Sequence, residues 1–107
     1  MISQKILDAL AENDWKPHID TDDSSIELEW YSPAGEDFML SFNVKDDDDF
    51  LSQFFDAYMN FDTEQHALEN YGMRGAPGLR VLLDDADVIE DELKHLWGEL
   101  SKVKETV

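Results

Sequence analysis

Carboxylates are the side chains of this sequence that could do the widest range of chemistry, and they occur in rows. They fall in three places along the chain: Glu27, Glu29 and Asp37; Asp46, Asp47, Asp48 and Asp49; and Asp84, Asp87 and Asp91. Such rows could bind a divalent cation, supply an acid–base pair, or present negative charge to a basic partner. The spacing within each row decides among these uses.

Calcium chemistry requires a spacing that the sequence does not have. An EF-hand loop carries acids at positions 1, 3 and 5, glycine at 6 and glutamate at 12. In a loop starting at Asp20, Ser25 replaces the glycine and Tyr31 replaces the glutamate, and in a loop starting at Asp46, position 12 is Ala57. We therefore predict no metal and no cofactor.

Other catalytic patterns are equally incomplete. Glu92 and His95 have the Glu-x-x-His spacing of di-iron bundles, but the chain has no second copy of that motif. Cysteine is absent, and no serine stands in a G-x-S-x-G context. Arg74 and Arg80 flank a glycine-rich turn. The backbone amides of the turn and the two arginines could bind an anion, or the arginines could simply pair with nearby carboxylates. The sequence predicts a protein that is not an enzyme.

Net charge restricts the partners more sharply than any motif does. The chain has 26 Asp and Glu against 8 Lys and Arg, a formal net charge of −18 over 107 residues. Phosphates of nucleic acids and anionic membranes would meet like charge, so neither is an expected ligand. Basic proteins are the partners that remain. The alternative is that the acidity serves only solubility or reflects a high-salt host.

The composition predicts one folded unit over residues 1–107. Six Phe, three Trp and three Tyr provide a core that a disordered acidic tail would lack. No apolar run is long enough for a membrane span or a signal peptide. We expect a cytoplasmic protein that is a monomer or a weak homodimer.

Apolar periodicity in the first half predicts a helix followed by a sheet. Helical spacing extends from about Ile2 to Asn13, and residues 15–20 are extended, with Pro17 marking an edge strand. Alternation in Ser25–Tyr31 and again in residues 37–44 predicts a hairpin closed by residues 32–36. The three segments form an antiparallel meander whose exposed face carries the first acidic row, with Glu27 and Glu29 pointing to solvent.

The second half is predicted to be helical. Asp46–Asp49 provides the acidic start of a helix whose aromatic stripe, from Phe50 to Tyr58, belongs to the core. A third helix starts at Asp62 or Thr63 and ends at Tyr71. The last helix spans Leu79 to about Val103, with a break at Asp84–Asp85 as an alternative. Its heptad seam comprises Leu82, Ala86, Ile89, Leu93, Leu96, Leu100 and Val103.

These elements define an α+β fold: an N-terminal helix, a three-stranded antiparallel meander, then three helices with a long C-terminal one. The seam is expected to pack on the sheet, because a small domain needs that surface for its own core. Pairing of part of the seam with a helix of another protein is the alternative.

Two segments carry a resemblance to a known group. Tyr31-Ser32-Pro33-Ala34-Gly35-Glu36-Asp37-Phe38, and the stretch from Gly75-Ala76-Pro77-Gly78 to Leu93, resemble parts of small acidic proteins of phages and mobile elements in gut Firmicutes. That group has no established function. The resemblance implies a setting in which small acidic proteins include anti-CRISPR and antirestriction inhibitors that mimic DNA.

The leading hypothesis is an acidic protein that binds the basic nucleic-acid-binding surface of another protein, such as a CRISPR or restriction nuclease. Its partner-binding residues would be the three acidic rows. The alternative is a non-catalytic module that binds a partner helix or strand through the hydrophobic seam or a sheet edge. The salt dependence of binding distinguishes the two hypotheses, because screening weakens electrostatic contacts and leaves hydrophobic contacts unchanged.

Overall fold

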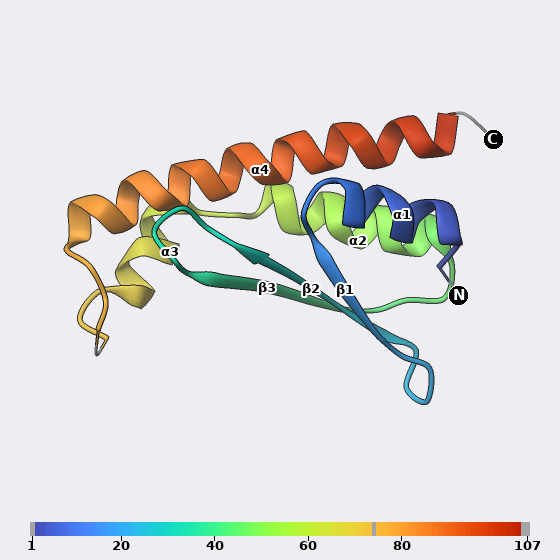
Figure 1. Ribbon diagram of the computed structural model, residues 1–107, viewed down its shortest axis with the longest axis horizontal. Coiled ribbons are helices and arrows are strands. Elements are labelled where there is room, and N and C mark those ends of the chain that lie inside the picture. The colour runs from blue at the N-terminus through green and yellow to red at the C-terminus, as the bar shows by residue number, and fades with distance from the viewer. Residues whose placement is uncertain (1, 74, 106–107) are drawn as a thin grey trace.

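The computed structural model describes residues 2–73 and 75–105. Within them, the order of elements agrees with the predicted α+β arrangement (Figure 1). The elements are α1 (Gln4–Glu12), β1 (Lys16–Asp20), β2 (Ser25–Tyr31), β3 (Asp37–Asn43), α2 (Asp47–Met59), α3 (Thr63–Asn70) and α4 (Leu79–Glu105).

The strands form an antiparallel meander in the order β1-β2-β3, with β2 in the centre. Ile26 pairs with Phe42 and Leu28 with Leu40, so these side chains share one face. Ile26 and Leu28 are buried, whereas Glu27 between them is exposed. Alternation along β2 therefore separates a core face from an outer face, as the sequence predicts.

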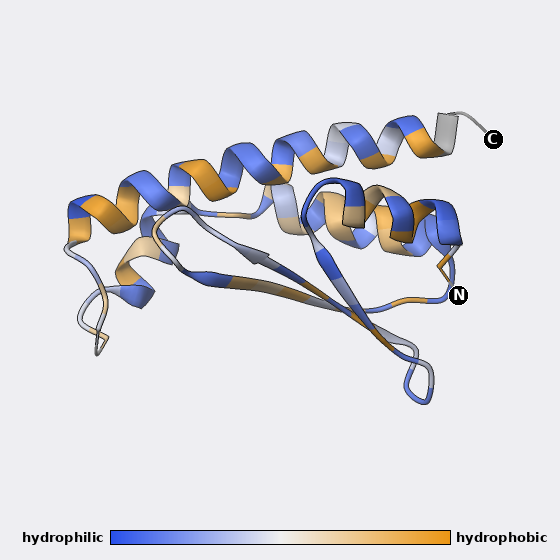
Figure 2. Ribbon diagram, viewed as in Figure 1, coloured by the Kyte–Doolittle hydropathy of each residue, from blue (hydrophilic) through white to orange (hydrophobic). Residues whose placement is uncertain are grey.

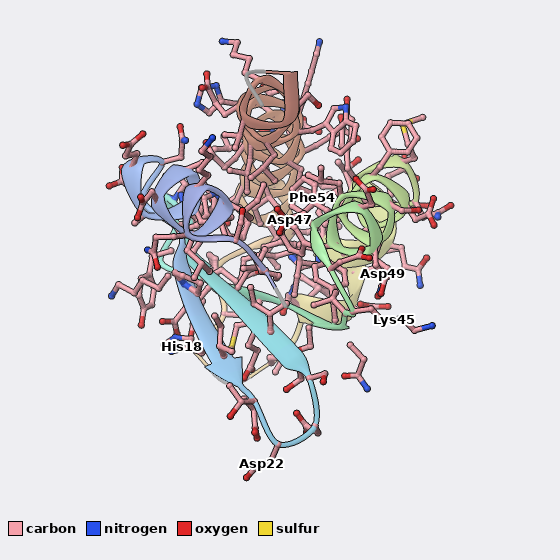
Figure 3. The ribbon with its side chains drawn as sticks, turned by 90° about the vertical axis from the view of Figure 1, so that its right-hand side faces the viewer. His18, Asp22, Lys45, Asp47, Asp49 and Phe54 are labelled. Carbon is pink, nitrogen blue, oxygen red and sulfur yellow. The ribbon has the colours of Figure 1, made fainter. Side chains whose placement is uncertain are left out.

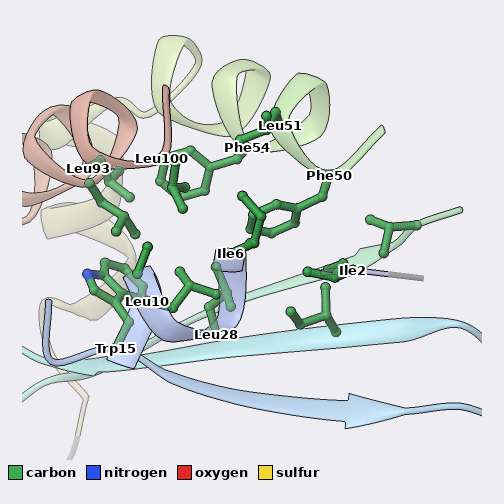
Figure 4. Packing of buried hydrophobic residues seen from close by; sticks show 14 of the residues in the cluster. Ile2, Ile6, Leu10, Trp15, Leu28, Phe50, Leu51, Phe54, Leu93 and Leu100 are labelled. Atoms are coloured by element: carbon green, nitrogen blue, oxygen red, sulfur yellow. The ribbon is translucent and has the colours of Figure 1, made fainter. Parts of the chain in front are cut away.

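The helices cover only the core face of the sheet. In Figure 1, α4 crosses above α1, α2 and α3, and its N-terminal half lies directly above the turn between β2 and β3. The cluster between these layers includes Trp15, Leu28, Phe50 and Leu93, and Figure 4 shows these residues packed together. None of the helices within residues 2–73 and 75–105 lies on the outer face of the sheet.

The heptad seam of α4 is buried in the same hydrophobic cluster as Ile26, Leu28 and Phe38 of the sheet, so the seam belongs to the protein's own core as predicted. Ile89, Leu93, Leu96 and Leu100 have no exposed surface. The backbone of α4 lies nearest to α1, α2 and α3, and its seam side chains reach the core that these helices share with the sheet. Figure 2 shows the apolar side of α4 turned toward these helices.

Other boundaries also differ from the expectations. Helix α1 begins at Gln4, two residues later than predicted, and α4 continues through Asp84 and Asp85 without a break. The aromatic stripe of α2 is only partly core: Phe54 is buried, while Phe55 remains 38% exposed beside Trp97.

Candidate interaction surface

The outer face of the sheet brings together the first acidic row. Tyr31 pairs with Asp37 across β2 and β3, and Glu29 and Glu27 follow at alternate positions of β2. On the other side, β1 places Lys16 opposite Glu29 and His18 opposite Glu27. We call the surface formed by Glu27, Glu29 and Asp37, with Lys16 and His18 beside them, the acidic sheet face.

Glu29 is more enclosed than the sequence suggests. Only 15% of its side chain is exposed, and its Oε1 lies 3.6 Å from Nε2 of His18. The expectation that Glu29 points freely to solvent is therefore wrong, because side chains of both neighbouring strands flank the central strand. Glu27, two residues earlier, is exposed as predicted.

Asp37 lies among other carboxylates of the acidic sheet face. Desolvation raises the pKa of its carboxyl above the usual range, and the hydrogen bond with Glu29 and the charges of Glu29 and Glu27 raise it further. Lys16 acts in the opposite direction, but its Nζ also lies 5.3 Å from the centre of the Tyr31 ring. The acidic sheet face thus keeps an excess of negative charge that the fold does not neutralise.

The Asp46–Asp49 block has a strong local role. Asp46 caps α2 by accepting the N–H of Asp49 at 2.9 Å, and Asp49 accepts the N–H of Lys45 at 2.9 Å. The N–H of Lys45, then the Gln53 amide, hold the pKa of the Asp49 carboxyl below its usual range. Figure 3 shows Asp49 close to Lys45 at the start of α2.

Asp47 connects this block to the first helix. Its Oδ1 accepts the N–H of Ser3 at 2.7 Å, which fixes the start of α1 against α2. Asp46 and Asp48 are exposed. Asp46, Asp47 and Asp49 therefore accept hydrogen bonds that shape the fold, whatever they also offer to a partner.

The third row is exposed along α4 but does not join the first. Asp84, Asp87 and Asp91 are all exposed. Because the first row lies on the outer face of the sheet and α4 lies beyond its core face (Figure 1), a flat partner surface cannot cover both rows at once. The acidic sheet face and the α4 row are separate candidate surfaces.

Sequence reasoning missed a buried polar network beside these rows. The Ser32 hydroxyl donates to Oδ2 of Asp85 at 2.6 Å, and the N–H of Ala34 donates to Oδ1 at 3.1 Å. Asp85 is only 6% exposed. Its position, three residues after Leu82 and four before Ile89, puts it on the apolar side of the helix, and that spacing was the signal available.

A second polar contact lies close by. His66 Nε2 is 2.7 Å from Oε2 of Glu36, and Asn70 donates to Oε1 of the same carboxylate at 3.3 Å. Glu36 and Asp85 line a cavity of about 380 Å³ between the β2–β3 turn and the loop before α4. These contacts fasten α3 and α4 to the hairpin turn.

The remaining predicted candidates are not assembled into a site. Trp15 donates to Glu92, and His95 is hydrogen-bonded to Asn13, so each side chain of the Glu-x-x-His motif contacts the α1–β1 connection. Within the described residues no group of three or more His, Asp or Glu is arranged to hold a metal ion. Arg74 lies outside the described residues, and Arg80 is exposed.

Comparison of the chain with protein-family models, curated proteins and solved structures found no match. Within residues 2–73 and 75–105, every helix is too short or too polar to cross a bilayer. Functional inference therefore depends on the geometry and charge described above.

Proposed function

We propose that the protein binds the basic nucleic-acid-binding surface of another protein through its acidic sheet face. The observation that carries this proposal is the packing of Glu27, Glu29 and Asp37 on an uncovered sheet face, close enough to raise the pKa of Asp37. Like charges held together in the free protein favour a partner that brings cations.

The rigidity of the sheet supports this proposal. β2 is paired on both sides, so Glu27 and Glu29 project from the central strand with about 6.6 Å between them. The backbone that carries these carboxylates is already ordered in the sheet, so binding does not have to order it, which favours affinity. The net charge of −18 would also steer the protein toward basic clefts from a distance.

The proposed partner class is a cytoplasmic nuclease of a CRISPR or restriction system, with inhibition by DNA mimicry. Such enzymes expose rows of Lys and Arg that receive phosphates. The alternative that uses the heptad seam has less support, because the chain itself buries that seam.

A competition assay tests the proposal. A guide-loaded CRISPR nuclease and a restriction enzyme are each incubated with labelled duplex DNA, and the protein is titrated into both mixtures while bound DNA is followed by gel shift. We expect displacement of DNA by the wild type. In the double variant Glu27→Lys with Asp37→Lys, like-charge contacts should weaken inhibition by about tenfold or more.

A matched control distinguishes the effect of the position of the substituted charges from the effect of the change in net charge. Glu12→Lys with Glu64→Lys makes the same change in net charge at exposed positions on α1 and α3. Inhibition close to wild type is expected for this control. Equal loss in both double variants would contradict a role for the sheet face, and no displacement from either enzyme would contradict the proposed partner class.

A further inference from the structure

The direction of the backbone hydrogen bonds shows which groups of β3 are open. Ser32 donates its N–H to Glu36, and Val44 donates its N–H to Ser24, each at 2.9 Å. With the register of β2 and β3, these bonds place the even-numbered residues of β3 in the hydrogen-bonded pairs. The N–H and C=O groups of Asp37, Met39 and Ser41 therefore point away from β2, to the free edge of the sheet.

This edge is unoccupied along most of its length. Among the described residues, no hydrogen bond reaches the outward N–H or C=O groups of Asp37, Met39 or Ser41. At the far end, the Gln53 side chain donates to the carbonyl of Asn43 at 2.7 Å and closes the row. Met39 is 43% exposed, and Asp37 and Ser41 are also exposed.

The opposite edge is protected, which makes β3 distinctive. Because the even-numbered residues of β2 bond to β3, Lys16, His18 and Asp20 form the hydrogen-bonded pairs between β1 and β2, and the backbone of Pro17 and Ile19 is turned to the free edge. Proline has no N–H, so Ile19 supplies the only outward donor of this five-residue strand. β3 has neither a proline nor a lysine to block pairing. A long open edge of this kind is a template for another strand.

Charge complementarity identifies the occupant of the edge. A strand added beside β3 would put every second side chain on the outer face, next to Asp37 and within reach of Glu29. Its other side chains would continue the inner face beside Leu40 and Phe42, which are only partly buried. A second copy of this chain would instead bring another −18 charge to the same place.

We propose that the β3 edge binds an extended segment of a partner in which Lys or Arg alternates with apolar residues. The segment joins the sheet as a fourth strand through the outward groups of Asp37, Met39 and Ser41. This inference rests on the proposed function, because the cations of the segment are those that the acidic sheet face attracts. It adds a specific mode of docking: strand addition, which charge attraction alone does not require.

Amide hydrogen exchange and binding measurements test the inference with a defined probe. The probe is a capped peptide of about nine residues in which Lys and Val alternate, long enough to cover β3. A control peptide has the same composition, with the lysines in one block. We expect the alternating peptide to slow exchange at the amides of Asp37, Met39 and Ser41 by about tenfold or more, and the block peptide to leave them unchanged.

Two proline variants provide the matched pair. Met39→Pro removes an outward N–H from β3 and leaves the bonds to β2 intact, while Ile19→Pro makes the same change on β1. Affinity for the alternating peptide should fall by about tenfold or more in Met39→Pro and stay near wild type in Ile19→Pro. Unchanged affinity in Met39→Pro, or no protection at the three amides of the wild type, would overturn strand addition.

The charge variant separates this inference from the proposed function. If Glu27→Lys with Asp37→Lys abolishes peptide binding while Met39→Pro does not, the acidic sheet face stands and strand addition is overturned. If Met39→Pro abolishes binding and the charge variant does not, the edge binds strands without need of the acidic sheet face, and the requirement for Lys or Arg in the partner segment is overturned.

Discussion

At the scale of single residues, aspartate carboxylates lie in very different environments at different positions. Asp49 accepts hydrogen bonds that stabilise its charge, Asp37 is crowded by Glu29, and Asp85 is buried with two donors. The sequence predicted that the acids before Phe50 begin a helix, because local spacing determines a cap. It could not predict the burial of Asp85, since its partners Ser32 and Ala34 are more than fifty positions away.

Asp37→Asn and Asp49→Asn should change stability in opposite directions at pH 7. The raised pKa of Asp37 means that its charge opposes folding above that pKa, so the neutral variant should melt at a higher temperature. The lowered pKa of Asp49 means that its charge favours folding above the usual aspartate pKa, so its variant should melt at a lower temperature.

Both differences should disappear in acid. As the pH falls through the usual aspartate range near about pH 4, Asp37 and then Asp49 become protonated in the wild type, which comes to resemble the variants. Thermal melts of the three proteins from neutral pH to about pH 3 measure this. If both variants change the melting temperature in the same direction at pH 7, the environments of Asp37 and Asp49 are wrongly described.

Asp85→Ala should lower the free energy of unfolding by about 1–3 kcal/mol, because the Ser32 hydroxyl and the Ala34 N–H would lose their acceptor. Its neighbour Asp84 is exposed, so Asp84→Ala should change stability by less than about 0.5 kcal/mol. Urea unfolding of both variants makes the comparison, and equal costs would contradict a structural role for the buried carboxylate.

At the scale of elements, periodicity predicted nearly every helix and strand. Alternation in β2 and the 4–3 spacing in α4 repeat often enough to specify which side is buried. The placement of α1, α2 and α3 beside α4 was not predictable in the same way, because helix neighbours depend on long-range packing. The half-buried state of Glu29 has the same origin, since its contact with His18 crosses from β2 to β1.

Leu93→Ala should destabilise the protein by about 2–5 kcal/mol, because Leu93 is fully buried in the middle of the seam and its truncation leaves a cavity. Val88 on the same helix is 39% exposed, and Val88→Ala should cost less than about 0.5 kcal/mol. Denaturant unfolding compares them. A loss below about 0.5 kcal/mol for Leu93→Ala would mean that the seam is not part of the core.

At the scale of the whole molecule, repulsion between like charges destabilises the fold, whereas burial of the hydrophobic core stabilises it. A net charge of −18 on a chain of radius of gyration 14.5 Å produces repulsion that reaches across the molecule at low salt. The surface pair Lys102–Glu99, at 3.3 Å, is too exposed to compensate for it. A protein that keeps such an imbalance is well suited to a partner that supplies the missing cations.

The melting temperature should therefore rise from low to moderate NaCl, because salt shortens the range of repulsion to about 8 Å at physiological ionic strength. Differential scanning calorimetry at several NaCl concentrations follows this, with Asp37→Asn expected to respond less than wild type. A melting temperature that does not change with salt would show that the charges are far enough apart, or paired well enough, to be harmless.

The most direct test of the central claim is the salt dependence of binding to a guide-loaded CRISPR nuclease or a restriction enzyme, measured by titration calorimetry. If the acidic sheet face occupies a nucleic-acid-binding surface, Kd should rise by about tenfold or more between about 50 mM and about 300 mM NaCl. The slope should be shallower for Glu27→Lys with Asp37→Lys than for Glu12→Lys with Glu64→Lys. A Kd that does not change over this range, or equal slopes in the two double variants, would contradict the account.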